Sequence, residues 1–464
     1  MQIHGSGTAM QTAASTPAAT SPPPRHPLQG GRDSPTPGRA TEACAHARHA
    51  ADAVLPRYVK LIAAAPRDRV GDRNQARAVA AETMRALVQA GLHQPGEISC
   101  DSLLLAGRDR MGLERALTVT LKEWTDRIDF SEYERLIFIL AGSDHALAGA
   151  LGDVPTDDIV ITAYTGHKLT DDIIKARHLP SVVALPASAI TDAQRDALAS
   201  KTTLELLPGV AHDVDEASIA TAARDYRTRG YPPLPPIDGD TVSILLGGDV
   251  VEESEDTVTP TLRRLGAEDA RMQAHRIAKL ELAGRERCRF VIVSSPRTGK
   301  FGSDGVEISP NPHRAGIRDE VTRAFEEALR GYPNAEVQVF DFQHRDSPSA
   351  YRPLLHAYRE ATGPTGRIHV PGDSVSMVSE VASLLPGTVV IDETASMADD
   401  HRRAAAAIAA ESGIAILRGG GSLQLGKGAQ ATPPVSAARR IADAIVTHIR
   451  DSAARRRGPE AGAN

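Results

Sequence analysis

Aromatic residues are scarce in this chain, and their scarcity argues against one class of function. Phenylalanine, tyrosine and tryptophan make up 3 % of the 464 residues, whereas proteins that bind single-stranded nucleic acid stack bases on such rings. Basic residues are not in excess either, because the net charge is −6. Nucleic acid is therefore not an expected partner. With so few rings, the cores must be built from alanine, valine, leucine and isoleucine.

Cysteine and long apolar runs are also lacking. Cys44, Cys100 and Cys288 lie far apart and form no CxxC pair, which favours a reducing compartment. No apolar run approaches the roughly 20 residues that cross a bilayer, so we expect no transmembrane segment, while peripheral membrane contact stays open. No His/Cys cluster has metal-ligand spacing, and we expect no metal site and no obligatory cofactor. Lysine is rare beside alanine and arginine, as in GC-rich bacterial genes, which favours a bacterial cytoplasmic protein.

The first 42 residues differ in composition from the rest. They are rich in Ser, Thr, Pro, Ala and Gly, and such a segment buries too little apolar surface to fold. We expect a disordered leader or tail at 1–42 and a second disordered tail at 451–464. An acid-poor leader with several arginines also fits an organelle transit peptide. Its composition resembles the leaders of bacterial type III secreted effectors, so secretion into a host cell is the alternative localisation.

Strand and helix patterns alternate twice along the remaining chain. Helical runs are expected at Glu42–Ala64 and Asn74–Ala90, followed by nearly continuous aliphatic runs that are typical of strands covered on both faces. The stretch 227–240 is rich in proline and ends the first alternation. The pattern predicts an α/β fold with two Rossmann-like doubly wound domains, 43–226 and 241–450, which the linker joins across a cleft.

The stretch 367–392 predicts a β-loop-α-β unit, with a turn at Pro371-Gly372 and a helix from about Ser374 to Leu385. Asp373 or Ser374 can cap this helix, and the N–H groups of its first turn suit an anion such as a phosphate. A polar stripe can equally be a solvated helix face. The polar residues predicted on one face are Asp373, Ser376, Ser379, Glu380 and Ser383.

Two further loops follow predicted strands. Gly247 and Gly248 let backbone N–H groups approach a phosphate, although a glycine pair is more often a tight turn. The run SSPRTGK combines Ser295 with Arg297 and Lys300, which bind phosphate as a fork and as a point charge. A charged surface turn is the alternative. In a doubly wound sheet, these loops and the one at Gly372 converge on one edge.

The first half offers one weak catalytic candidate. Asp144 and His145 follow an apolar strand, and such a pair facing a cleft can deprotonate an acceptor hydroxyl. Asp144 is explained as well by a helix N-cap, which we favour. His212 is interpreted as a capping or core histidine.

The residues Gly372 to Glu380, GDSVSMVSE, resemble the signature of the mitochondrial-fission (elongated-mitochondria) family, which is grouped with the GT-B glycosyltransferases. The resemblance covers much of the chain after about residue 100 and includes Met377. In related GT-B enzymes the matching glutamate hydrogen-bonds the ribose of the donor nucleotide, so the resemblance implies this role for Glu380. The chain departs from the family at 384–387, where a Gly-Lys-Pro turn is usual.

The resemblance implies a glycosyltransferase that moves a sugar from a nucleotide-sugar donor to an unknown acceptor. The alternatives are a catalytically silent adaptor, including a secreted bacterial effector that acts on host organelles, and a nucleotide-sugar hydrolase or epimerase. The residues expected to bind the donor are Gly247, Gly248, Ser295, Arg297, Lys300, Asp373, Ser374, Ser376, Ser379 and Glu380.

Overall fold

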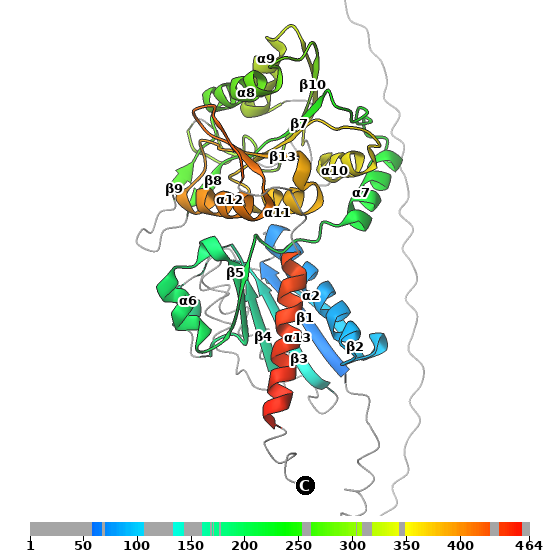
Figure 1. Cartoon of the computed structure of the whole chain (residues 1–464), viewed down its shortest axis with the longest axis vertical. Helices are drawn as coiled ribbons and strands as arrows, with labels where there is room; N and C mark the ends of the chain where they lie inside the picture. The colour runs from blue at the N-terminus through cyan, green and yellow to red at the C-terminus, as the bar shows by residue number, and fades with distance from the viewer. Residues whose placement is uncertain are drawn as a thin grey trace, which may run out of the picture. The chain divides into compact units, whose positions relative to one another are not determined.

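The computed structural model describes residues 58–66, 70–105, 133–142, 160–167, 169, 171–175, 178–252, 261–302, 304–308, 318–342, 349–426 and 436–456. They form two large sheets of mainly parallel strands, with helices on both faces (Figure 1). The predicted α/β class with two Rossmann-like doubly wound sheets is confirmed. The predicted leader, 1–42, lies outside the described residues. Within the described part of the chain, no helix combines the length and apolar character needed to span a membrane.

The first sheet has six parallel strands in the order β2-β1-β3-β4-β5-β6. The run from Leu136 to Ala141 is buried along its whole length because both faces of the sheet are covered. The strands are β1 (Tyr58–Pro66), β2 (Ile98–Leu105), β3 (Tyr133–Ala141), β4 (Val160–Thr165), β5 (Val182–Pro186) and β6 (Thr203–Leu207). The accompanying helices are α2 (Val70–Gln89), α5 (Asp171–Ile174) and α6 (Asp192–Ala199), with 3-10 turns η1 (Pro95–Glu97) and η2 (Ala187–Ala189).

Strand β1 corrects the prediction of a helix over Glu42–Ala64. Residues 58–66 pair in parallel with both β2 and β3. The three alanines from Ala63 to Ala65 favour a helix locally, but each is buried within the sheet, and tertiary contacts override so weak a preference. Residues 42–57 lie outside the described part. The second predicted helix, 74–90, is confirmed by α2.

The second sheet runs in the order β11-β10-β7-β12-β13-β14-β15, with only β15 antiparallel to its neighbour. Counted along the chain, the parallel strands follow the doubly wound order 3-2-1-4-5-6, whose direction of winding reverses between β7 and β12. The strands are β7 (Thr241–Leu245), β10 (Cys288–Val293), β11 (Ala335–Phe340), β12 (Ile368–Pro371), β13 (Val389–Asp392), β14 (Ala415–Leu417) and β15 (Leu423–Gln424). A separate hairpin is formed by β8 (Val250–Glu252) and β9 (Thr261–Arg263).

Helices cover both faces of this second sheet. Helices α8 and α9 contribute to the core on one face, and α10, α11 and α12 to the core on the other. Their bounds are α8 (Ala267–Glu281), α9 (Glu320–Arg330), α10 (Tyr351–Glu360), α11 (Val375–Leu384) and α12 (Asp399–Ser412), with η3 at Pro386–Thr388.

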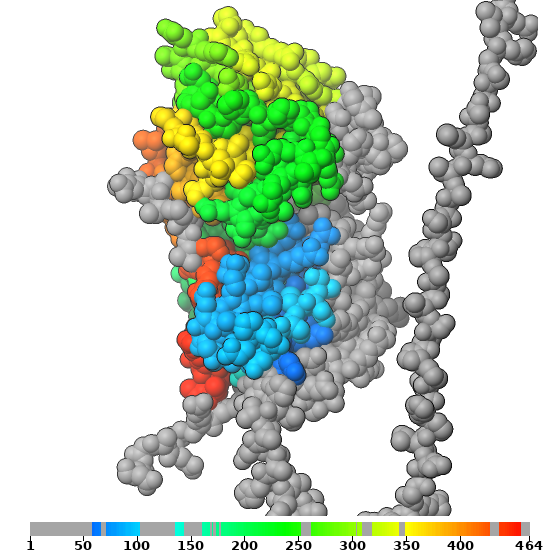
Figure 2. Space-filling model, turned by 90° about the vertical axis from the view of Figure 1, so that its right-hand side faces the viewer, coloured from blue at the N-terminus to red at the C-terminus, as the bar shows by residue number. Residues whose placement is uncertain are grey.

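Two helices pack on the sheet from the other half of the chain. Helix α7 (Glu216–Thr228) packs on α10 and places Ile219 and Tyr226 in the core of the second sheet. Helix α13 (Ala437–Arg456) packs on α2 in the core of the first sheet, as Figure 2 shows for the red and blue segments. The predicted limits 43–226 and 241–450 therefore do not match the two cores, and α13 extends into the predicted tail at 451–464.

We expect Ile441→Ala to destabilise the protein through the first core. Ile441 is fully buried where α13 meets the first sheet, and removing such a side chain costs about 2–5 kcal/mol. Urea unfolding measures the loss. Thr447→Ala on the exposed side of the same helix is the control and should change stability by less than about 0.5 kcal/mol. Equal effects of the two substitutions would contradict the packing.

Candidate functional site

The loops after β7, β12 and β13 meet at the side chain of Asp373. This carboxylate is fully buried and accepts three hydrogen bonds: 3.2 Å from the Gly248 N–H, 3.0 Å from Arg297 Nη2 and 2.8 Å from Thr394 Oγ1. Arg297 brings the loop after β10 to the same point. The predicted convergence of Gly248, Arg297 and Asp373 at the switch point of the second sheet is thus present in the structure.

The two glycines are required by this packing. A Cβ atom on Gly247 would lie 2.2 Å from Asp373 Oδ1, and one on Gly248 would lie 2.2 Å from the Arg297 carbonyl oxygen. Neither position accepts a side chain, so the loops after β7, β10 and β12 are held in direct contact.

The remaining predicted residues of the loop after β10 have other partners. Ser295 is buried, donates its N–H to Thr298 Oγ1 at 2.9 Å and accepts the Arg297 N–H at 3.3 Å. Thr298 Oγ1 in turn donates to the Gly247 carbonyl at 2.7 Å. Lys300 instead pairs with Glu307 at 3.4 Å. Ser295 therefore shapes the loop, and Lys300 is not directed at Asp373.

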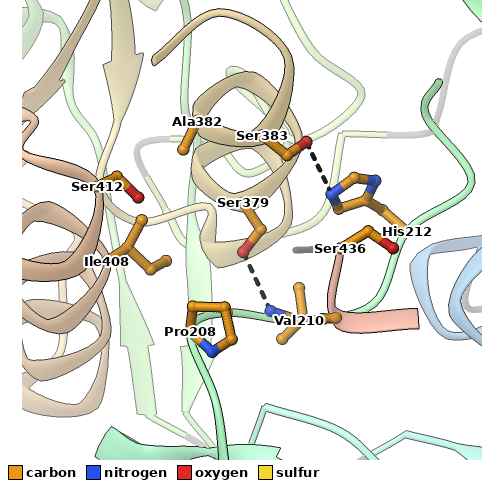
Figure 3. Close-up of a pocket in the computed structure, with 11 residues that line it drawn as sticks. Pro208, Val210, His212, Ser379, Ala382, Ser383, Ile408, Ser412 and Ser436 are labelled. Atoms are coloured by element: carbon orange, nitrogen blue, oxygen red, sulfur yellow. Dashed lines mark hydrogen bonds between the residues drawn. The ribbon is translucent and has the colours of Figure 1, made fainter. Parts of the chain in front are cut away.

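Helix α11 begins where the sequence predicts. Ser374 is its N-cap and accepts the Met377 N–H. Ser379 donates to the Val375 carbonyl at 2.8 Å and accepts the Val210 N–H at 3.1 Å, so the loop after β6 covers part of the polar face (Figure 3). The Ser376 hydroxyl has no hydrogen-bond partner among the described residues.

Glu380, the predicted ribose ligand, contacts α10. Tyr351 Oη donates to Glu380 Oε2 at 2.6 Å, and the neighbouring Arg352 pairs with Asp213 at 2.6 Å. Burial raises the pKa of Glu380 to about 7, against lowering contributions from the Tyr351 hydrogen bond and the Arg352 charge. The carboxyl group therefore titrates near neutral pH.

A small cavity lies beside this face of α11. It has a volume of about 20 Å³, which is room for about one water molecule. His212 Nε2 lies 3.1 Å from Ser383 Oγ at its edge (Figure 3). Burial lowers the pKa of His212 to about 4, so the imidazole is neutral at pH 7, consistent with a core histidine.

The arrangement at the switch point is suited to holding an oxyanion. Backbone N–H and guanidinium groups that bind a carboxylate bind phosphate oxygens by the same charge-assisted hydrogen bonds. Here the oxyanion is the chain's own Asp373. Asp144 and His145 lie outside the described residues. Among the residues described, no group of three or more His, Cys, Asp or Glu side chains is placed to hold a metal ion.

Sequence reasoning missed Thr394 and Tyr351. Thr394 follows β13 at the same sheet edge, so the rule that identified the other loops could have included it. Tyr351 lies 29 residues before Glu380, and nothing in its local sequence indicates the contact.

No protein-family model and no curated protein matches the chain. Among solved structures, it is similar to MurG of Acinetobacter baumannii, with 12 % identity, a TM-score of 0.37, and coverage of 87 % of this chain and 95 % of that one. A trehalose 6-phosphate synthase of Burkholderia multivorans has 14 % identity and a TM-score of 0.39, with coverage of 86 % and 93 %. An E. coli trehalose-6-phosphate protein bound with UDP-2-fluoro glucose has 13 % identity and a TM-score of 0.39, with coverage of 85 % and 97 %.

We expect Arg297→Ala to destabilise the protein by about 3 kcal/mol, because it leaves the buried Asp373 carboxylate without its cation. Urea unfolding gives the change. Lys300→Ala, which removes the partly exposed pair with Glu307, is the control from the same loop and should cost at most about 1 kcal/mol. A smaller loss for Arg297→Ala than for Lys300→Ala would exclude a structural role for the Arg297–Asp373 pair.

The raised pKa of Glu380 predicts a pH dependence of stability. The folded protein binds this proton more tightly than the unfolded chain, whose carboxyl has an ordinary pKa near 4.5. The contribution of Glu380 to the free energy of unfolding should therefore fall as pH rises from about 4.5 to about 7 and be constant on either side. The difference between wild type and Glu380→Gln in urea unfolding, measured across this range, isolates the effect. A difference that does not vary with pH would refute it.

Proposed function

We propose that this protein is a GT-B-like glycosyltransferase that uses a nucleotide-sugar donor. The observation that carries the proposal is the oxyanion site at the switch point of the second sheet, where Gly248, Arg297 and Asp373 meet beside the capped end of α11. Open α/β sheets bind phosphorylated ligands at this position. The choice of glycosyl transfer as the reaction rests on the resemblance of Gly372–Glu380 to the mitochondrial-fission family.

The donor would contact two parts of this site. Its diphosphate would bind the N–H groups of the Arg297 guanidinium that Asp373 does not occupy, while Arg297 Nη2 stays on Asp373. Ser374 and Ser376 lie at the start of α11, where phosphate oxygens are favoured. The ribose hydroxyls would donate to Glu380 in place of Tyr351, which now occupies that carboxylate. We assign no obligatory metal. The catalytic base that would deprotonate the acceptor stays a prediction, with Asp144 and His145 as its candidates.

One observation favours the silent adaptor as the second candidate. Three of the groups expected to hold the donor are engaged within the chain: Arg297 by Asp373, Glu380 by Tyr351, and Ser379 by Val210. The cavity beside α11 holds about one water molecule. A scaffold that never opens this face would bind protein partners in place of a nucleotide.

The test is thermal stabilisation by UDP-, GDP-, ADP-, dTDP- and CMP-sugars, with and without magnesium. A ligand at a hundred times its Kd should stabilise the folded state by about 2.7 kcal/mol. We expect one nucleotide class to do so, and Glu380→Gln to weaken its binding at least about tenfold through lost hydrogen bonds to a charged acceptor. Glu327→Gln, at an exposed position on α9, is the matched control. Stabilisation by no nucleotide in a folded sample would favour the adaptor.

A further inference from the structure

A second cavity, which has a polar lining, opens at the carboxyl ends of β13 and β14. Its volume is about 290 Å³, close to the lower limit of small-molecule sites. It is lined by residues of α8, of α12 and of the loops that follow the two strands. The predicted donor residues, in the loops after β7, β10 and β12, do not line it.

Three arginines from three separate elements line this cavity. Arg276 comes from α8, Arg402 from α12 and Arg418 from the loop after β14. Arg276 donates to the Glu393 carbonyl at 3.1 Å, and Arg418 to Gln424 Oε1 at 2.5 Å. Neither has a carboxylate within ion-pair distance in the described part of the chain, so their hydrogen-bond partners are neutral. The charge of Arg418 also acts at longer range on Glu393, where it helps to lower the pKa of that carboxyl.

Arg276 also has an unmet hydrogen bond. Its Nε is buried and has no partner among the described residues, and leaving a charged donor without an acceptor is unfavourable. A ligand oxyanion in the cavity would accept hydrogen bonds from the guanidinium edges that are not already bonded, in the fork geometry that carboxylates and phosphates favour.

The cavity also holds hydrogen-bond acceptors. Glu393 accepts the Gly419 N–H at 2.9 Å and Arg402 Nε at 3.2 Å, and the Gly419 bond is the largest of the contributions that lower the pKa of Glu393. Asp269 is the second carboxylate of the lining, which contains few apolar side chains, among them Met272. Acceptors beside guanidinium groups suit a ligand that carries hydroxyls as well as an oxyanion, and disfavour a flat apolar ring.

The cavity adjoins the switch point through one residue. Thr394 lines it and donates to Asp373 Oδ1 at 2.8 Å. A ligand in the cavity is therefore close to the head of α11.

We propose that this cavity binds the anionic group of a small polyhydroxylated ligand, that is, a sugar acid or a sugar phosphate. The ligand is either the sugar of the donor or a separate molecule. The site does not depend on the proposed function, because a free sugar acid or sugar phosphate can bind there without a nucleotide.

The experiment measures binding by calorimetry at constant ionic strength, with glucuronate, glucose 6-phosphate, glucose and inorganic phosphate. We expect both sugar anions to bind more tightly than glucose and than inorganic phosphate. Arg418→Gln should weaken their binding at least about tenfold through lost charged hydrogen bonds, and Arg276→Gln should act in the same direction. Arg271→Gln, at an exposed position on α8 outside the cavity, is the control. Equal binding of glucose and the sugar anions, or wild-type affinity of Arg418→Gln, would overturn the proposal.

A second arm identifies the source of the ligand. The affinities of UDP-glucuronate and UDP-glucose are compared, and likewise those of GDP-mannuronate and GDP-mannose. If the nucleotide of the sugar acid binds more tightly and Arg418→Gln removes the difference, the ligand of the cavity is the sugar of the donor. Glucuronate binding unchanged by a saturating nucleotide would support a separate ligand. If no nucleotide binds but the sugar anions do, the proposed function fails and this site stands.

Discussion

The buried carboxylate of Asp373 is the group on which the arrangement of loops at the carboxyl edge of the second sheet depends. A carboxylate removed from water must be paired and hydrogen-bonded, or it would take up a proton. Asp373 meets this requirement with the Gly248 N–H, Arg297 and Thr394, and these partners come from the loops after three different strands. The geometry of the edge therefore follows from solvating one charge.

The glycines and hydroxyls of the edge are consequences of the same constraint. Gly247 and Gly248 lack side chains because any Cβ atom would collide with Asp373 or with the Arg297 backbone. Thr298 fixes the loop that carries Arg297 by bonding to the Gly247 carbonyl. The donors at this edge are therefore held in fixed positions by the chain's own oxyanion, Asp373.

Local sequence predicted the elements of this fold well and their partners poorly. The strands are recognisable as aliphatic runs, and Ser374 caps α11 at the expected place, because burial on both faces and helix capping are local requirements. The sequence of β1 predicts a helix because alanine favours helices locally, and the strands that bury these alanines are far away in the sequence. The contact of Tyr351 with Glu380 and the packing of α13 on α2 are decided by the tertiary structure, which periodicity does not encode.

The exchange of α7 and α13 between the two cores also constrains the order of folding during synthesis. The first sheet is complete in sequence at Leu207, but the helix that packs on α2 begins only at Ala437. At roughly 5–20 residues per second, the ribosome needs on the order of tens of seconds to make the intervening chain. During that time the apolar face of α2 that α13 covers stays exposed. The second half of the chain must therefore be synthesised before the first half can complete its core.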